Sequence, residues 1–106
     1  MRALAGTITY FGPSGESGRE WFEMIPHAAG RTLRALCRMD DVDVWRDVSI
    51  CLDGNSRPRD AHIRVVQGGI VRGSMSYSTT PNALIYHGMT EEHGSVNERI
   101  SLSAPL

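Results

Sequence analysis

Three residues with complementary chemistry follow one another in the second half of the chain: Ser74, His87 and Glu98. A hydroxyl, an imidazole and a carboxylate in contact can act as nucleophile, base and orienting group. The sequence has no nucleophile elbow or oxyanion loop beside them, which argues against a hydrolase. Two interpretations stay open: a general acid–base role for His87 tuned by Glu98, or a structural hydrogen-bonded network.

These side chains can meet only if their segments are paired strands. Turn-forming clusters recur at short intervals, and seven or eight alternating segments of strand length lie between them, which is typical of a sandwich or barrel. No apolar residues keep a 3.6 period over three turns, so no long helix is expected. The clusters are GPSGESG at 12–18, PHAAG at 26–30, Asp40-Asp41, DGNSRPRD at 53–60, Gly68-Gly69, TTPN at 79–82 and MTEEHG at 89–94.

The predicted fold is a single all-β domain over residues 1–106, an eight-strand antiparallel up-and-down meander that closes into a small barrel or half-barrel. Its register is predicted most firmly at Asp40-Asp41, read as a two-residue hairpin turn. That turn aligns opposite charges, apolar residues and hydroxyls together, and a slip of one residue destroys the match. The expected pairs are Met39–Val42, Cys37–Val44, Ala35–Arg46, Leu33–Val48, Arg38–Asp43, Leu36–Trp45, Arg34–Asp47 and Thr32–Ser49.

The other hairpins are closed in the same way. The expected pairs are Met24–Leu33, Phe22–Ala35, Glu20–Cys37, Ile8–Phe22, Tyr10–Glu20, Val65–Arg72, Ile63–Ser74, Ser76–Ile85, Ser74–His87, His87–Val96 and Ile85–Glu98.

Because side chains alternate along a strand, this register assigns each residue to a face. The face that we take as inner carries an aliphatic core: Leu4, Ile8, Phe22, Met24, Leu33, Ala35, Cys37, Met39, Val42, Val44, Val48, Ile50, Leu52, Ile63, Val65, Ile85, Val96, Ile100 and Leu102. It also carries polar residues, which predict a wet or liganded cavity because buried polar groups must be paired or hydrated. The candidate ligand-binding residues are Tyr10, Glu20, Arg46, Arg72, Ser74, Ser76, His87 and Glu98.

Arg46 is the most specific candidate, because it interrupts a run of inward valines opposite the small Ala35. A guanidinium there can anchor a ligand carboxylate or phosphate. Alternatively, it pairs with Glu20 or Glu98, or extends to the rim.

The outer face is expected to carry an apolar row of Trp21, Leu36 and Trp45, flanked by charges: Glu23, Arg34 and Asp47 on one side, and Arg19, Arg38 and Asp43 on the other. Such a row indicates either a contact surface, and hence a homo-oligomer, or isolated exposed aromatic residues.

The net charge of −1, with both signs mixed, gives no basic patch for nucleic acid. No apolar run is long enough for a membrane helix or a signal peptide, so we expect a cytoplasmic protein with a mature N-terminus. The thiols of Cys37 and Cys51 are expected to be reduced. His27, His62 and His93 lack metal-ligand spacing, so no metal site and no cofactor is expected. The chain stops just after the last expected strand, so either the fold finishes there or the chain is a shortened form.

The expected architecture is similar to that of lipocalins and fatty-acid-binding proteins. Gly18-Arg19-Glu20-Trp21 does not match the Gly-x-Trp spacing of lipocalins, and no helical lid follows the first strand, so no specific family is identified. The leading functional hypothesis is binding of a small, partly apolar, anionic molecule in an internal cavity. The alternatives are a cofactor-independent isomerase or lyase using His87 and Glu98, and an interaction domain using the tryptophan row.

Overall fold

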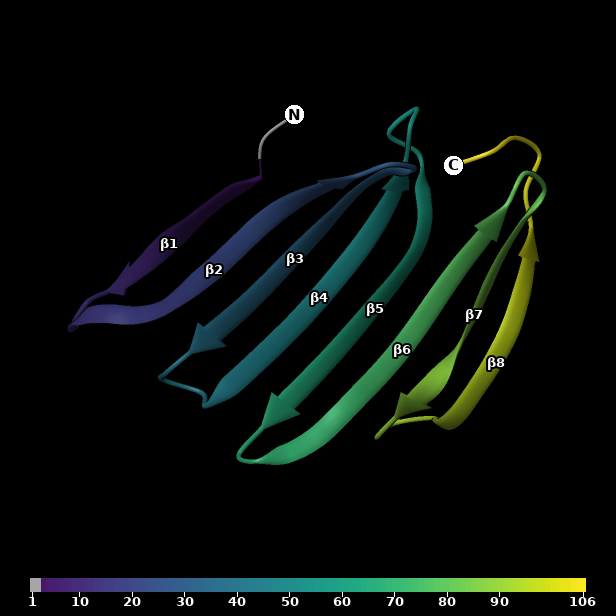
Figure 1. Ribbon diagram of the computed structural model, residues 1–106. Coiled ribbons are helices and arrows are strands. Elements are labelled where there is room, and N and C mark those ends of the chain that lie inside the picture. The colour runs from purple at the N-terminus through teal and green to yellow at the C-terminus, as the bar shows by residue number, and fades with distance from the viewer. Residues whose placement is uncertain (1–2) are drawn as a thin grey trace.

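The computed structural model describes residues 3–106, which form a single eight-stranded sheet (Figure 1). The predictions of an all-β chain and of up-and-down order are confirmed, since each strand pairs antiparallel with its predecessor. The strands are β1 (Leu4–Gly12), β2 (Gly15–His27), β3 (Gly30–Met39), β4 (Val44–Asp53), β5 (Pro58–Gln67), β6 (Ile70–Thr80), β7 (Ala83–Thr90) and β8 (Gly94–Ser101).

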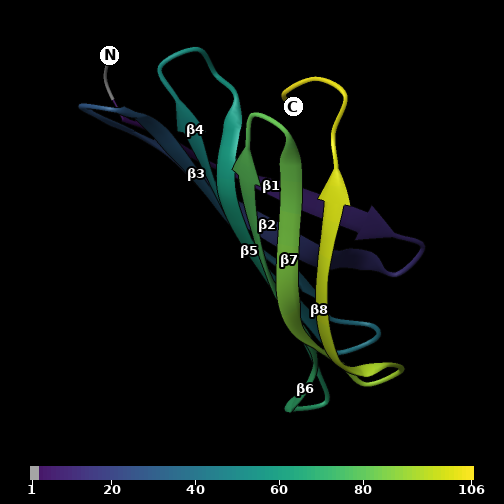
Figure 2. The same cartoon turned by 90° about the vertical axis from the view of Figure 1, so that its right-hand side faces the viewer.

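The sheet is open in this structure, with β1 and β8 as its two edges. Twist accumulates from strand to strand, so that β1 and β8 run in clearly different directions (Figure 2). The two edge strands do not pair, so a closed barrel is not formed. Residues 3–106 contain no helix that could span a membrane.

Pairing places directly opposed residues on the same face, so the register sorts the strands into two surfaces. We call one the Cys37 face, on which Cys37 and Arg46 lie. The other is the Trp45 face, on which Trp21, Leu36 and Trp45 lie. Aliphatic residues run along the Cys37 face of the central strands: Leu33 and Ala35 of β3, Val44, Val48 and Ile50 of β4, and Ile63 and Val65 of β5.

A single layer cannot enclose a core, and this one does not. Among residues 3–106 the buried apolar residues are Cys37 and Ala83, while Leu4 is 63% and Ile8 is 43% exposed. The predicted inner residues of β1 to β5 do share the Cys37 face, but no second layer covers them. Sheets are normally stable only when one face packs against another layer.

The predicted two-residue turn at Asp40-Asp41 is wrong. Residues 40–43 form the connection, and Met39 pairs with Val44, so the register is displaced by two residues. Asp43 adopts a φ of 50°, and its amide donates to the carbonyl of Asp40 at 3.3 Å. Because aspartate tolerates the left-handed conformation, a longer turn forms here. A displacement of two preserves the faces but changes the partners: Cys37–Arg46, Ala35–Val48, Leu33–Ile50, Arg38–Trp45, Leu36–Asp47, Arg34–Ser49 and Thr32–Cys51.

Of the first two hairpins, β2–β3 has the predicted register and β1–β2 does not. The predicted pairs of Met24 with Leu33 and of Glu20 with Cys37 are confirmed. The predicted pairing of Ile8 with Phe22 is displaced by two residues, since Ile8 pairs with Glu20. Because this displacement is also by two residues, the faces of β1 are again as expected, and a bulge lies between Tyr10 and Phe11.

The hairpin at Gly68-Gly69 changes the faces. The two glycines form the expected two-residue turn, with φ of 58° and 77°. An irregularity between Val65 and Val66 then leaves Arg72 without a direct partner, so Val65 pairs with Gly73. The extra residue moves every later residue of β6 to the opposite face from the one predicted. The amide of Glu91 donates to the Arg72 carbonyl at 2.9 Å and occupies the acceptor that the bulge releases.

A second odd displacement, in the turn between β7 and β8, reverses the first. His87 pairs with Asn97 rather than Val96, and Tyr86 rather than Ile85 lies opposite Glu98. Consequently Ile85 and His87 lie on the Trp45 face, whereas β8 returns to the predicted assignment.

Candidate functional site

The Cys37 face carries a short polar row in the middle of its aliphatic surface. Glu20 of β2, Cys37 of β3 and Arg46 of β4 are direct neighbours, with Ile8 and Val65 at the two ends of the row. Cys37 is only 6% exposed, which follows from its place between two long side chains on a central strand. A carboxylate and a guanidinium therefore flank a buried thiol.

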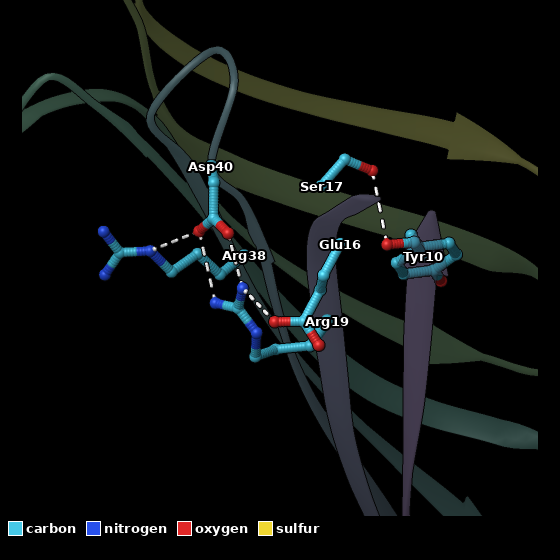
Figure 3. Close-up of polar contacts among 6 residues, drawn as sticks. All are labelled: Tyr10, Glu16, Ser17, Arg19, Arg38 and Asp40. Atoms are coloured by element: carbon cyan, nitrogen blue, oxygen red, sulfur yellow. Dashed lines mark hydrogen bonds and ion pairs between the residues drawn. The ribbon is translucent and has the colours of Figure 1, made fainter. Parts of the chain in front are cut away.

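Tyr10 joins this row from β1. Its hydroxyl donates to the Glu20 Oε2 at 3.2 Å, and this hydrogen bond raises the pKa of Tyr10 above its usual range. The hydroxyl of Ser17 donates to the Tyr10 carbonyl at 3.3 Å (Figure 3). The Ser17 carbonyl in turn accepts a hydrogen bond from the Asp40 amide at 2.8 Å. The turns at this end of the sheet thus fix the position of Tyr10.

A hollow of about 390 Å³ lies beside the row, with Tyr10 and Arg46 as its polar lining. Its walls are apolar: Cys37, Met39, Val44 and Val65. Tyr10 is on β1 and Val65 on β5, strands that a flat sheet would place about 19 Å apart. That both border one hollow indicates a curve of the sheet towards the Cys37 face at this end. An apolar wall with a few polar groups is the usual form of a small-molecule site.

Arg46 makes no ion pair and no side-chain hydrogen bond with any of residues 3–106. The residue is exposed and lines the hollow. The sequence left two interpretations of Arg46, and the partners Glu20 and Glu98 are not bound to it in this structure.

The remaining predicted site residues are not brought to this hollow. Ser74, Ser76 and His87 lie on the Trp45 face because of the bulge at Arg72. Ser74 lies opposite Met89, not opposite His87, and its hydroxyl is 3.4 Å from the Nε2 of His62. Arg72 itself forms an ion pair with Glu91 beside the bulge.

Glu98 shares the Cys37 face but lies on the far edge strand, β8. Tyr86 donates a hydrogen bond to Glu98 Oε2 at 2.5 Å, which raises the pKa of Tyr86, and Tyr77 lies 5.6 Å from Tyr86 between ring centroids. Tyr77, Tyr86, Glu98 and Met75 are among the residues that line a hollow of about 610 Å³. His87 and Glu98 are therefore on opposite faces of one sheet, and the expected proton-transfer pair is not assembled.

Tyr77 and Tyr86 were missed by sequence reasoning because the faces of β6 and β7 were interchanged. The available signal was the alternation of Leu84 and Tyr86 along β7, which places two large apolar residues on one face. The alternation of Ile85 and His87 supports the opposite assignment equally well, and only the bulge at Arg72 determines which pair lies on the Cys37 face.

The Trp45 face gathers the predicted tryptophan row. Trp21 pairs with Leu36, and Trp45 lies one pair further along, opposite Arg38, whose guanidinium stacks 4.5 Å from the ring centroid. A hollow of about 530 Å³ borders Trp21 and Leu36.

The charges around the tryptophan row are largely paired with one another. Asp40 accepts hydrogen bonds from Arg19 and from the Nε of Arg38 at 3.1 Å, and Arg19 also contacts Glu16 at 2.9 Å (Figure 3). The hydrogen bonds from Arg19, with a further contribution from Arg38, lower the pKa of Asp40.

No group of three acidic, histidine or cysteine side chains within residues 3–106 could hold a metal ion. His27 and Cys51 approach each other, with 3.8 Å between Nε2 and Sγ, but they supply only two donors. Cys37 and Cys51 are free thiols on opposite faces. Comparison of the chain with protein families, curated proteins and solved structures finds no match.

Proposed function

We propose that this chain binds a partly apolar molecule with an acidic group on the Cys37 face, and that Arg46 contacts the acidic group. The observation that carries the proposal is an exposed arginine with no ion-pair partner among residues 3–106, which lines an apolar-walled hollow of about 390 Å³. The size falls within the usual range of ligand pockets, about 300–1,000 Å³.

The neighbours of Arg46 favour an anion over a neutral ligand. The nearest carboxylate in its row, Glu20, accepts a hydrogen bond from Tyr10. Arg46 therefore retains all its donors for a ligand, and guanidinium matches a carboxylate, sulfonate or phosphate in a two-point geometry. Met39, Val44 and Val65 offer the apolar contact for the remainder of the molecule.

A bound molecule needs a second wall, because one sheet covers only one side of it. In the barrel expected from the sequence, pairing of β1 with β8 supplies that wall. We include such closure, induced by the ligand, in this proposal as one route to an enclosed site. The isomerase or lyase alternative is not carried further, because His87 and Glu98 lie on opposite faces.

The test compares two fluorescent probes that differ in charge. Anilinonaphthalene sulfonate is an anion, and N-phenylnaphthylamine has the same ring system without the sulfonate. We expect Arg46→Leu to weaken binding of the anion by about tenfold, the equivalent of about 1.4 kcal/mol, and to leave the neutral probe unaffected. Arg99→Leu, at an exposed position of the opposite face, is the matched control.

Circular dichroism must show that the variant is folded. An equal loss of both probes, or no loss of either, contradicts the role of Arg46. Unfolding by Arg46→Leu would instead show that Arg46 is needed for the fold, and the proposal would fail.

A further inference from the structure

The chain exposes more surface than its mass accounts for. Its accessible area is 7193 Å², whereas a compact monomer of 11.7 kDa exposes about 5,900 Å². The radius of gyration is 16.0 Å, against about 13 Å for a globular chain of this length. Roughly 1,300 Å² of surface is therefore present that a folded domain of this size normally buries.

The Cys37 face is the part of the molecule that such burial would cover. It extends across all eight strands. Beside the polar row of Glu20, Cys37 and Arg46 lie two apolar rows, one of Phe22, Ala35, Val48 and Ile63 and one of Met24, Leu33, Ile50 and Ala61. The molecule measures 47 × 40 × 20 Å along its principal axes, so the area of one face of the sheet exceeds the area that a stable interface needs, about 800 Å² per partner. The hollow beside Arg46 occupies only one end of this face, so a small ligand cannot cover it.

The charges on this face indicate which protein could lie against it. Among the directly paired residues that the register assigns to this face, Glu20 and Glu98 are balanced by Arg31 and Arg46. A face with no net charge does not repel a second copy of itself. A face that binds an acidic or a basic partner would instead carry an excess of the opposite charge. A second sheet of the same dimensions is large enough to cover the aliphatic rows of the first, and packed sheets lie about 10 Å apart.

We propose that two copies of this chain pack through their Cys37 faces and form a two-layered dimer. The interface is isologous, so each copy supplies the second wall for the hollow of the other. This inference does not depend on the proposed ligand, since it follows from the excess surface and from the balance of charge. It also differs from the association through Trp21, Leu36 and Trp45 that the sequence suggests.

The test is sedimentation velocity over a range of protein concentrations, with two variants at neighbouring positions of β4. Val48 lies on the Cys37 face and Ser49 on the Trp45 face. We expect the parent and Ser49→Asp to sediment at twice 11.7 kDa, and Val48→Asp at 11.7 kDa or as an unfolded chain. Trp45→Glu should also keep the mass of the dimer.

Because Val48→Asp can fail to fold, a charge variant provides an independent measurement. Arg46→Glu makes the Cys37 face acidic, so the dimer should dissociate at least tenfold more readily and recover with added salt. Arg99→Glu on the Trp45 face is its control. A parent that is monomeric and folded at all concentrations would overturn the inference. A dimer that Trp45→Glu dissociates and Val48→Asp does not would overturn it equally.

The two proposals fail separately. If the parent is monomeric and anilinonaphthalene sulfonate still binds through Arg46, the ligand site stands and the dimer does not. If the parent is a dimer and Arg46→Leu has no effect on either probe, the reverse holds.

Discussion

The two faces of this sheet place their charged residues differently. On the Trp45 face the charges form pairs in solvent: Arg34 with Glu23 at 3.2 Å, and Arg64 with Asp47 at 3.6 Å. On the Cys37 face the charges are few, and Arg46 has no ion-pair partner among residues 3–106.

Exposed apolar residues do not distinguish the two surfaces, since Trp21 is 41% exposed on one and Ile8 is 43% exposed on the other. The arrangement of charge does distinguish them. Side chains that pair with neighbours in their own layer are suited to water, because screened pairs cost little and gain little there. An aliphatic surface with isolated charges is suited to a partner that covers the apolar side chains and pairs with those charges. We therefore assign the Trp45 face to solvent and the Cys37 face to contact.

Two leucines of β3 provide the strongest test of this assignment. Leu33 lies on the Cys37 face and Leu36 on the Trp45 face, and both are half-buried within one chain. If a second layer covers the Cys37 face, Leu33→Ala leaves a cavity and costs about 2–4 kcal/mol of unfolding free energy. Leu36→Ala should cost about 1 kcal/mol, since its site stays open to water.

Urea unfolding of both variants at two protein concentrations measures this difference. The midpoint of the parent should rise with concentration, as for any dimer that unfolds to monomers. Equal losses for the two variants would remove the distinction between the faces.

The sequence predicts the strands and their order because both depend on short-range signals. Turn residues and alternation define each segment, and consecutive hairpins leave one simple topology. The pair of Met24 with Leu33 follows from that reasoning and is confirmed. The displacement by two residues at Asp40 leaves the assignment of residues to faces unchanged, because side chains alternate between the faces with a period of two.

The candidate site was predictable only as far as the bulge at Arg72. Tyr10, Glu20 and Arg46 come together because β1 to β4 keep their faces. Ser74 and His87 lie on the other face because Arg72 is an extra residue without a direct partner in β5. No local residue pattern predicts this bulge. Closure could not be predicted either, since it depends on whether distant edges meet.

A smaller effect should appear in acid, on the Trp45 side. Arg19 holds the pKa of Asp40 below its ordinary value of 3.8. A lowered pKa stabilises the folded state above the unfolded value, and this contribution is lost as the pH falls from about 4 through the folded value.

The urea midpoint of the parent should therefore decline more steeply below about pH 4 than that of Asp40→Asn. Asp41→Asn, one residue further along the turn, is the control and should behave as the parent does. A parallel decline in Asp40→Asn and the parent would show that the Arg19 contact has no energetic weight.

The smallest expected effect is charge reversal of an exposed pair, and it completes the comparison of the faces. The side chains of Arg64 and Asp47 are 51% and 49% exposed, and their charged groups lie 3.6 Å apart. Asp47→Arg should therefore lower the free energy of unfolding by only about 0–1 kcal/mol, whatever the protein concentration. Glu20→Arg, the corresponding reversal on the Cys37 face, removes the acceptor of Tyr10 and adds a second cation beside Arg46. Its cost should be larger and should grow when the protein is concentrated, because like charges are then brought under a second layer. Urea unfolding of the two variants side by side decides this, and equal small losses at every concentration would mean that water reaches both faces alike.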